Sequence, residues 1–374
     1  MLDWMQKPLI AALGVLGSVI FLVFVLAGTG LLWLTSREYK PEDREPVTVT
    51  PSLSLKPARF QPIELYSWNI GYASLDEKQD FFMDGGKGVR PSTARNVEEN
   101  MWAIQAYFAA VAPDIIFLQE VDVNSKRSYR VNQAEYFSET WKGSSAFALN
   151  FNARFVPVPF PHFIGKVESG LLTLNSYGSS GAERLSLPSS FTWPERIAQL
   201  KRCLLVQRVP VQENGVNGAG AGYTPPPGAE LVLVNLHLEA YDEGGVGRVA
   251  QTRFLADFLN AEYAKGNYVV AGGDFNQVFP ALKDAFPIVE NEFFTPGVVD
   301  ASLFGEGWVL AADASAPSCR SLDKPYNGAR EGHQFYIIDG FILSPNVELI
   351  SVQTQDLDFK NSDHNPVKLT FSLK

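Results

Sequence analysis

The amino-acid sequence predicts one α/β domain that follows a single membrane-spanning helix. An uncharged apolar run near the N-terminus predicts the helix, and short apolar strand patterns alternating with two amphipathic helical patterns predict the domain. The chain has 374 residues, of which 46% are hydrophobic, so a sizeable hydrophobic core is expected. We therefore divide the chain into an anchor at residues 1–35, a linker at 36–60 and one domain at 61–374.

The anchor is predicted from its length and its lack of charge. Residues 8–34 carry no charged side chain and exceed the ~20 residues that a helix needs to cross a bilayer. Trp4 and Trp33 lie near its two ends, where interfacial aromatic residues are common. A cleaved signal peptide is the alternative, but the run is long for one and no clear A-x-A site follows. We interpret the segment as a single N-terminal anchor.

The elements that follow are predicted from periodicity. Residues 36–60 are rich in proline and charge and show no helical period, which indicates a linker or an extended stalk. Strand patterns then lie at residues 63–70, 114–121, 170–174, 201–209, 230–238, 267–274, 336–343, 346–354 and 366–373. A helix in residues 92–114 has an inward face of Val97, Met101, Ile104, Phe108 and Val111. A helix in residues 247–266 is expected to turn inward Val249, Phe254, Leu255, Phe258 and Leu259.

The charge balance and the cysteine content narrow the function classes. The net charge is −10 and the sequence pI is about 5.0, with no basic tail. Tight, passive binding of long nucleic acid needs a basic surface, so this class is disfavoured. An enzyme that meets nucleic acid transiently, with bound metal cations supplying positive charge, remains compatible. Cys203 and Cys319 are the two cysteines, and a single potential pair does not define a compartment.

Polar side chains recur at or near the ends of the apolar strand patterns. Each one taken singly fits a turn, a helix cap or a satisfied core group. Together they indicate one acid-rich, histidine-bearing metal site, because ligand sites gather at strand ends in α/β folds. The residues concerned are Asn69, Glu120, Asp122, His237, Asp274, Asn276, Asp339, Asp363 and His364.

The motifs that carry these residues resemble a known superfamily. "WNIG", "PDIIFLQEVD", "LVNLHLEA", "GGDFNQ", "IIDGFIL" and "SDHNPV", in this order, are similar to the endonuclease/exonuclease/phosphatase superfamily. That group includes deoxyribonuclease I-like nucleases, apurinic endonucleases, neutral sphingomyelinases and inositol-polyphosphate phosphatases. The resemblance runs from about residue 63 to the C-terminus. It implies a four-layer α-β-β-α sandwich, with two mostly antiparallel sheets between outer helices and the site at one edge.

The resemblance implies metal-dependent hydrolysis of a phosphoester bond. Glu120 is the expected metal ligand, with Asn69 beside it and Asp363 contributing. Mg²⁺ is the implied ion and Mn²⁺ the alternative, since hard cations prefer oxygen ligands. His237 is expected to donate to a non-bridging phosphate oxygen. Glu168 matches the acid that steadies this histidine, although the motif around Glu168 departs from the usual pattern.

The same resemblance assigns the proton-transfer groups. Asp274 is expected to orient or deprotonate the attacking water, and Asn276 to hold that water or a phosphate oxygen. His364 would contact the phosphate and share the acid–base work, with Asp339 as its orienting carboxylate.

Three basic residues outside the motifs are candidates for substrate binding. Residues 83–92 form a glycine-rich loop that leads into a helix, where backbone donors with Lys87 and Arg90 could hold an anionic group. A solvated flexible loop is an equal alternative. Arg320 lies in a segment, residues 317–335, that reads either as a substrate-recognition loop or as a surface excursion.

The function predicted from these residues is a membrane-anchored, Mg²⁺-dependent phosphodiesterase or phosphatase. A nuclease of the same superfamily and a non-catalytic binding module are the alternatives. The expected partners are a phosphorylated substrate (a lipid head group, a small phosphoester or a nucleic acid) and the membrane, and no protein partner is implied. Lys7 precedes the span whereas Arg37, Lys40 and Arg44 follow it, which by the positive-inside rule favours a cytoplasmic domain. The bias is small, and by analogy with exported anchored hydrolases we expect an extracytoplasmic domain.

Overall fold

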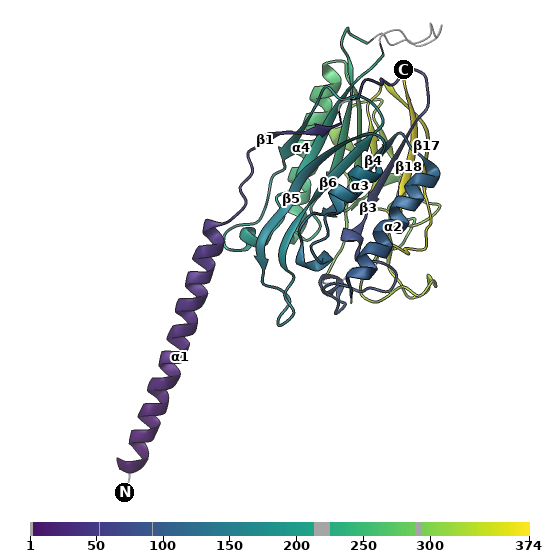
Figure 1. Cartoon of the computed structure of the whole chain (residues 1–374). Coiled ribbons are helices and arrows are strands. Elements are labelled where there is room, and N and C mark those ends of the chain that lie inside the picture. The colour runs from purple at the N-terminus through teal and green to yellow at the C-terminus, as the bar shows by residue number, and fades with distance from the viewer. Residues whose placement is uncertain (1–2, 52, 92, 213–224, 289–292) are drawn as a thin grey trace.

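A long N-terminal helix projects from the body of the protein (Figure 1). The computed structural model describes residues 3–51, 53–91, 93–212, 225–288 and 293–374. Helix α1, Asp3–Ser36, contains a stretch at Ala11–Ser36 with a mean hydropathy of 2.5 and no buried side chains. This stretch is long and apolar enough to cross a membrane, and a signal sequence would have the same character.

The body is built on two seven-stranded sheets. The order in the first sheet is β1 (Arg44–Val47), β7 (Gly181–Ser186), β8 (Cys203–Pro210), β9 (Glu230–His237), β10 (Tyr268–Asp274), β16 (Asp339–Leu343) and β13 (Val309–Ala311). The order in the second sheet is β17 (Val347–Thr354), β18 (Val367–Leu373), β3 (Ile63–Asn69), β4 (Ile115–Asp122), β6 (Gly165–Asn175), β5 (Ser144–Val156) and β2 (Val49–Thr50). The pairs β3–β4 and β9–β10 are parallel, whereas the other pairs within these sheets are antiparallel.

The sheets face one another and helices cover their outer sides, which confirms the predicted four-layer sandwich. Leu65 and Phe117 of the second sheet pack against Leu233 and Val270 of the first in one buried cluster. Helices α2 (Ala94–Val111) and α3 (Gln133–Thr140) cover the outer face of the second sheet. Helix α4 (Val246–Ala264) covers the outer face of the first. The alternation of side chains along each strand therefore fills three apolar layers.

The inward face of α2 agrees with its periodicity. Thr93 is the N-cap and its side chain accepts a hydrogen bond from the amide of Asn96 at 3.3 Å. The predicted face is confirmed, with Val111 half-buried and four fully buried members, Val97, Met101, Ile104 and Phe108.

The predicted inward face of α4 is partly wrong. Leu255 and Leu259 are buried, and Phe254 and Phe258 are half-buried, but Val249 is 60% exposed. The buried face instead has polar members, Gln251, Thr252 and Glu262. Gln251 donates to Pro188 O and accepts from the amide of Glu239, so a hydrogen-bonded glutamine occupies an inward position. Hydrophobic periodicity alone does not detect such a position.

The segment expected as a linker contributes to the domain, since β1 pairs with β7 and β2 pairs with β5 at one edge of each sheet. The strand pattern at residues 336–343 is interrupted, because Ile337 and Ile338 separate β15 (Phe335–Tyr336) from β16.

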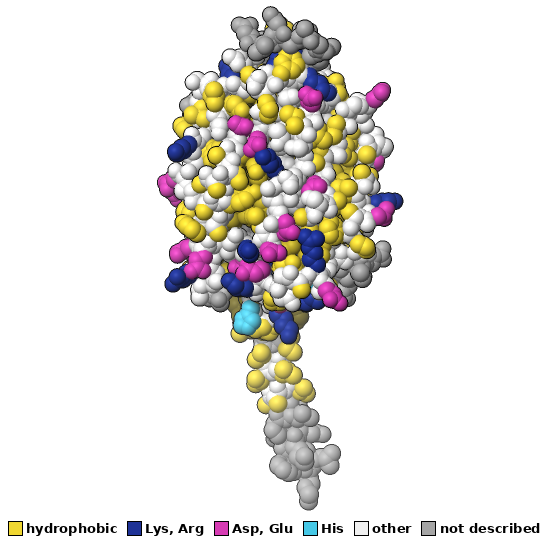
Figure 2. Space-filling view, turned by 90° about the vertical axis from the view of Figure 1, so that its right-hand side faces the viewer, with side chains coloured by type: hydrophobic (Ala, Val, Ile, Leu, Met, Phe, Trp, Pro, Cys, Tyr) yellow, Lys and Arg dark blue, Asp and Glu magenta, His cyan; other side chains and the backbone are white. Residues whose placement is uncertain are grey.

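Cys203 and Cys319 are both buried free thiols. On the face shown in Figure 2, lysine and arginine side chains are interspersed with acidic ones.

Candidate active site

The predicted site residues meet where adjacent strands end. Asp274 at the end of β10 lies opposite His237 at the end of β9 and opposite Asp339 at the start of β16. Asn69 ends β3, beside the end of β4 that carries Glu120. Because β3–β4 and β9–β10 are parallel pairs, their carboxyl ends lie at the same edge of each sheet. The register therefore brings residues from distant parts of the sequence to one edge of the sandwich.

The backbone at Glu120 and immediately before Asp274 has a special conformation. Glu120 has a φ of 56° and lies where the pairing of β4 with β6 shifts between Leu118 and Val121. Gly273 has a φ of 148°, and a Cβ there would lie 1.9 Å from Leu236 O. Only glycine fits at that position, immediately before Asp274. A bulge and a close strand approach thus direct the Glu120 and Asp274 side chains.

Buried amides join the two sheets behind the site. Gln119 Nε2 donates to Asn235 Oδ1 at 2.8 Å and to Ser67 Oγ at 3.2 Å. Asn235 Nδ2 donates in turn to Leu172 O at 3.0 Å. The Gln119–Asn235 and Asn235–Leu172 hydrogen bonds cross the interface between the sheets and link them at this end, whereas the bond to Ser67 joins neighbouring strands of the second sheet.

Asp274 is the centre of the site. Its Oδ2 accepts a hydrogen bond from Asn69 Nδ2 at 3.0 Å and lies 3.3 Å from His237 Nε2 and 3.8 Å from His364 Nε2. Its Oδ1 accepts from the amide of Asn276 at 2.9 Å. Burial and the nearby charge of Asp339 raise the pKa of Asp274 above its ordinary value. A carboxylate with a raised pKa is a stronger general base for water.

His364 is paired with Asp339, as predicted. Its Nδ1 lies 2.8 Å from Asp339 Oδ2, which also accepts a hydrogen bond from Ser318 Oγ. Burial alone lowers the pKa of His364, but the Asp339 carboxylate outweighs burial and raises this pKa well above its ordinary value. Imidazolium is therefore the favoured form of His364 at neutral pH.

His237 has the opposite protonation preference. Burial, followed by the positive charges of Arg202 and His364, lowers the pKa of His237 well below its ordinary value. Its Nδ1 is buried and has no hydrogen-bond partner among the described residues. Glu168, the residue expected to steady His237, is instead paired with Lys166 at 3.1 Å. The structure therefore does not bring Glu168 and His237 together.

The three expected metal ligands are Asn69, Glu120 and Asp363. Asn69 Nδ2 donates to Glu120 Oε1 at 3.3 Å. Burial raises the pKa of Asp363 to about 6, and the negative charge of Glu120 contributes to this rise. A Cβ at Gly71 would lie 2.8 Å from Asp363 Oδ1, so this glycine is required by the carboxylate. A hard divalent cation would offset the repulsion between the half-buried Glu120 and the buried Asp363. Asn69 turns its amide nitrogen toward Glu120, and its Oδ1 accepts from the amide of Gly71 at 3.0 Å.

Two other groups of side chains could also hold a metal ion. One ligand atom from each of Asp274, Asp339 and His364 lies within 4.8 Å of the others, and the same holds for Cys319, Asp363 and His364. Their donors include histidine nitrogen and, in the second case, cysteine sulfur. The set at Asn69, Glu120 and Asp363 has oxygen donors alone, which match the preference of Mg²⁺.

Comparison with known proteins places the chain in a family. The sequence profile of the Endonuclease/Exonuclease/phosphatase family matches residues 66–287, more than half of the chain. The chain belongs to this family. Its members are metal-dependent hydrolases of phosphoester bonds and include phosphodiesterases, nucleases and phosphatases. A search of curated proteins finds no match.

Solved structures support the family's fold for this chain. An endonuclease/exonuclease/phosphatase from Beutenbergia cavernae DSM 12333 is 18% identical, with a TM-score of 0.57 over 84% of this chain and 72% of that chain. D. rerio TDP2, in complex with a single-strand DNA product, is 15% identical, with a TM-score of 0.50 over 83% of this chain and 99% of that chain. At these identities the similarity shows the fold.

Of the three basic residues predicted outside the family motifs, one lines the site cavity and two do not. Lys87 and Arg90 are exposed and do not line the site cavity. The amides of Lys87 and Gly88 donate to the Asp80 carboxylate, so that loop already uses these donors internally. Arg320 lines the cavity, but its guanidinium is buried and donates to loop carbonyl oxygens, among them Asp76 O at 2.8 Å.

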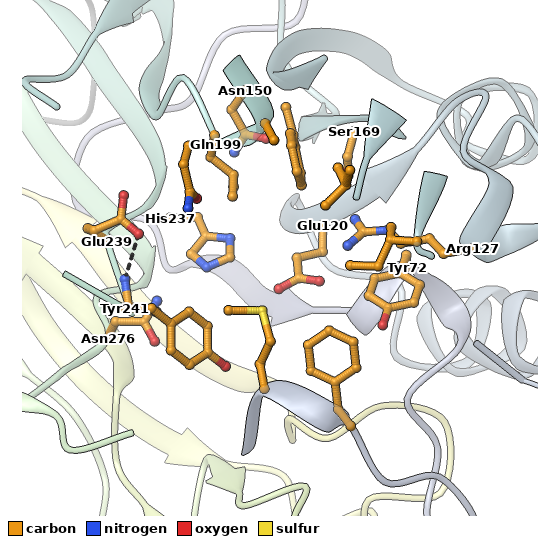
Figure 3. Close-up of a pocket in the computed structure, with 18 of the residues that line it drawn as sticks. Tyr72, Glu120, Arg127, Asn150, Ser169, Gln199, His237, Glu239, Tyr241 and Asn276 are labelled. Atoms are coloured by element: carbon orange, nitrogen blue, oxygen red, sulfur yellow. Dashed lines mark hydrogen bonds between the residues drawn. The ribbon is translucent and has the colours of Figure 1, made fainter. Parts of the chain in front are cut away.

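Several cavity residues were not predicted from the sequence. The family site opens into a cavity of about 650 Å³, into which His237 and Glu120 point (Figure 3). Arg202 lies beside His237, is 5% exposed and donates to His237 O at 3.3 Å. Tyr241 Oη donates to Asp84 Oδ1 at 2.7 Å. The Arg127 guanidinium lies over the Tyr72 ring at 3.7 Å. None of these lies in a motif, although the adjacent basic pair before β8 is a visible signal for Arg202.

Proposed function

We propose that this protein hydrolyses a phosphoester bond by metal-assisted, in-line attack of water. The observation that carries the proposal is the position of Asp274, which lies against Asn69, His237 and His364 in one buried cluster. This cluster combines a carboxylate base, an imidazolium and a neutral imidazole within reach of one phosphoryl group. Membership of a family of metal-dependent hydrolases supports the same reaction class.

In this mechanism, a divalent cation held by Asn69, Glu120 and Asp363 would supply polarisation of the phosphoryl group and stabilisation of the leaving oxygen. Asp274 orients the attacking water and accepts its proton, which its raised pKa favours. Asn276 Nδ2 donates to Leu238 O at 2.9 Å, so its amide oxygen is the group available to hold the water.

The two histidines have different roles in the proposed reaction. His364, held as imidazolium by Asp339, donates to the phosphate and shares the acid–base work. His237, held neutral by burial and by Arg202, donates to a non-bridging oxygen as negative charge develops there. Arg202 is paired with the buried Glu239 carboxylate at 3.6 Å and donates to His237 O at 3.3 Å, so we assign it to positioning the end of β9 that carries His237.

We also propose that α1 anchors the enzyme to a membrane, with Mg²⁺ as its metal. The length and hydropathy of α1 support the anchor. By analogy with exported anchored hydrolases, we place the catalytic domain on the extracytoplasmic side. Protease added to intact cells should then degrade the domain. Degradation only after cell lysis would place it in the cytoplasm.

A substrate panel tests the proposed reaction. The full chain in lipid nanodiscs is assayed with Mg²⁺, with Mn²⁺ and with EDTA on bis-p-nitrophenyl phosphate, phosphoinositides, sphingomyelin, RNA and plasmid DNA. Metal-dependent turnover that is lost in both Asp274→Ala and His364→Ala supports the proposal. Efficient cutting of plasmid at physiological salt would favour a nuclease instead. Absence of both turnover and metal binding would favour a binding module with this fold.

A further inference from the structure

The cavity at the proposed catalytic site has a polar end and an apolar end. Asn69, His237 and Asp274 line the polar end. The same cavity extends to Val156 at the end of β5 and Val158 just after it, to Ile197, and to Leu31 and Leu34 in the last turns of α1. An apolar wall therefore runs from the reacting phosphate position to the end of the membrane-spanning helix.

The end of α1 is fixed against this cavity by specific contacts. Trp193 Nε1 donates a hydrogen bond to Thr35 Oγ1 at 3.1 Å. The Glu38 carboxylate is 3% exposed and lies 3.2 Å from both Arg196 Nε and Lys201 Nζ. Lys40 Nζ is a third cation near this carboxylate, at 3.8 Å. A buried carboxylate paired in this way holds its position closely, since separation would leave it without its partners. The segment that lines the cavity and the end of α1 are thus held together.

An exposed aromatic hairpin continues the same apolar surface. Val158 is 44% exposed and Phe160 is 86% exposed in the connection between β5 and β6. The Phe163 ring lies 6.0 Å from that of Phe160 and 5.3 Å from that of Phe155, which lines the cavity. In Figure 1 the β5–β6 connection extends downward from the lower end of the body, and α1 also extends downward from the body. Large apolar side chains exposed beside a membrane-spanning helix suit contact with lipid.

We infer that the substrate is a membrane amphiphile, a phosphoester that carries a hydrocarbon chain. Its phosphate lies at Asp274 and His364, and its chain follows Val156, Val158 and Ile197 toward Leu31 and Leu34. The inference rests on the proposed function for its phosphate end. A polyanion such as DNA would instead need a row of cations along this wall, where valine, isoleucine and leucine side chains lie.

A series of p-nitrophenyl alkyl phosphates, from ethyl to octyl, tests the chain-binding wall below micelle-forming concentrations. Water attacks phosphorus and the bond to p-nitrophenolate breaks, which releases the alkyl phosphate and a coloured product. For the full chain in nanodiscs, kcat/KM should rise roughly fourfold for each fully buried methylene and at least about a hundredfold from ethyl to octyl. Binding of ethylphosphonate and octylphosphonate, measured by calorimetry, gives a readout that does not depend on turnover.

A matched pair of valine substitutions separates the wall from general effects. Val158→Glu places a charge on the wall and should reduce the preference for octyl over ethyl at least about tenfold. Val249→Glu is the control, because Val249 is 60% exposed on α4 and does not line the cavity. The alkyl probes partition into the nanodisc equally for both variants. A difference between Val158→Glu and Val249→Glu in the preference for octyl over ethyl therefore measures binding of the alkyl chain to the wall.

The outcomes distinguish the inference from the proposed function. Equal turnover of the ethyl and octyl esters, or equal effects of Val158→Glu and Val249→Glu, would overturn the inference and leave the hydrolase intact. Tighter binding of octylphosphonate than ethylphosphonate by the wild type, weakened only in Val158→Glu and without turnover of any ester, would overturn the proposed function and support the amphiphile site.

Discussion

Asp339→Asn is the most informative single substitution, because it removes a charge and keeps the shape of the side chain. Asp339 Oδ2 lies 2.8 Å from His364 Nδ1 and accepts from Ser318 Oγ at 2.8 Å. Asparagine retains an oxygen that can accept from Ser318, so the fold should persist. What is lost is the carboxylate charge that holds His364 as imidazolium.

The size of the effect follows from Coulomb's law. Two unit charges about 4 Å apart interact by about 4 kcal/mol at an effective dielectric constant of about 20. If that interaction stabilises the transition state through an imidazolium, its loss slows the reaction by about a thousandfold. This lies inside the range of about 10² to 10⁴ that general acid–base groups contribute. We therefore expect kcat/KM of Asp339→Asn to fall by about 10³ at neutral pH.

The pH profile of kcat/KM for bis-p-nitrophenyl phosphate is the assay. Activity that needs the imidazolium is lost as pH rises through the folded-state pKa of His364, which Asp339 raises. Without the carboxylate this pKa falls, so the alkaline loss of activity should move to lower pH. Asp257→Asn, at an exposed position of α4, is the matched control and should leave the profile unchanged. A rate within tenfold of wild type with an unmoved profile would refute the role of the Asp339–His364 pair.

Three further predictions concern stability and the metal. Burial alone would raise the pKa of Glu262, but hydrogen bonds from Arg208, Lys265 and Asn267 lower this pKa to about 2. The ionised Glu262 carboxylate therefore stabilises the fold above pH 4.5, and this stabilisation is lost as pH falls toward 2. Glu262→Gln should therefore lower the free energy of unfolding by about 2 to 3 kcal/mol at pH 7, with a difference from wild type in urea titrations that disappears toward pH 2; a pH-independent difference would contradict this. Phe117→Ala removes a fully buried ring between the sheets and should cost about 3 to 5 kcal/mol in the same titrations, and a cost below 1 kcal/mol would contradict the packing. Glu120→Gln should weaken Mg²⁺ and Mn²⁺ binding measured by calorimetry by at least about tenfold, and unchanged affinity would exclude Glu120 as a ligand.

The family resemblance predicted the four-layer sandwich, whereas local patterns predicted the individual strands and the polar residues at their ends. Short apolar runs locate β3, β4, β9 and β10, and the site residues lie at or near the ends of these strands. Asp274 and His364 lie in short motifs whose order along the chain is informative. The pairing of His364 with Asp339 was predicted from the family resemblance, and the structure places them at 2.8 Å.

The features that sequence reasoning missed depend on contacts between distant segments. Val249 looks like an inward residue, but the hydrogen bonds of Gln251 set the orientation of α4. Glu168 follows the family position, yet it pairs with Lys166, two residues before it on the same face of β6, rather than with His237 on the other sheet. The apolar cavity combines the ends of α1 and β5 with Ile197, and no local pattern relates these three.

Hydrolysis of bis-p-nitrophenyl phosphate by Asp274→Asn tests the central claim most directly. Asp274 is the buried carboxylate that the proposed mechanism uses as its base, and Asp257→Asn provides the same chemical change at an exposed site. We predict that wild type and Asp257→Asn turn over the ester with Mg²⁺ or Mn²⁺ and stop with EDTA. Asp274→Asn, still folded by circular dichroism, should lose about 10² to 10⁴ in kcat. Turnover by Asp274→Asn equal to that of Asp257→Asn, or turnover of wild type unaffected by EDTA, would contradict the account.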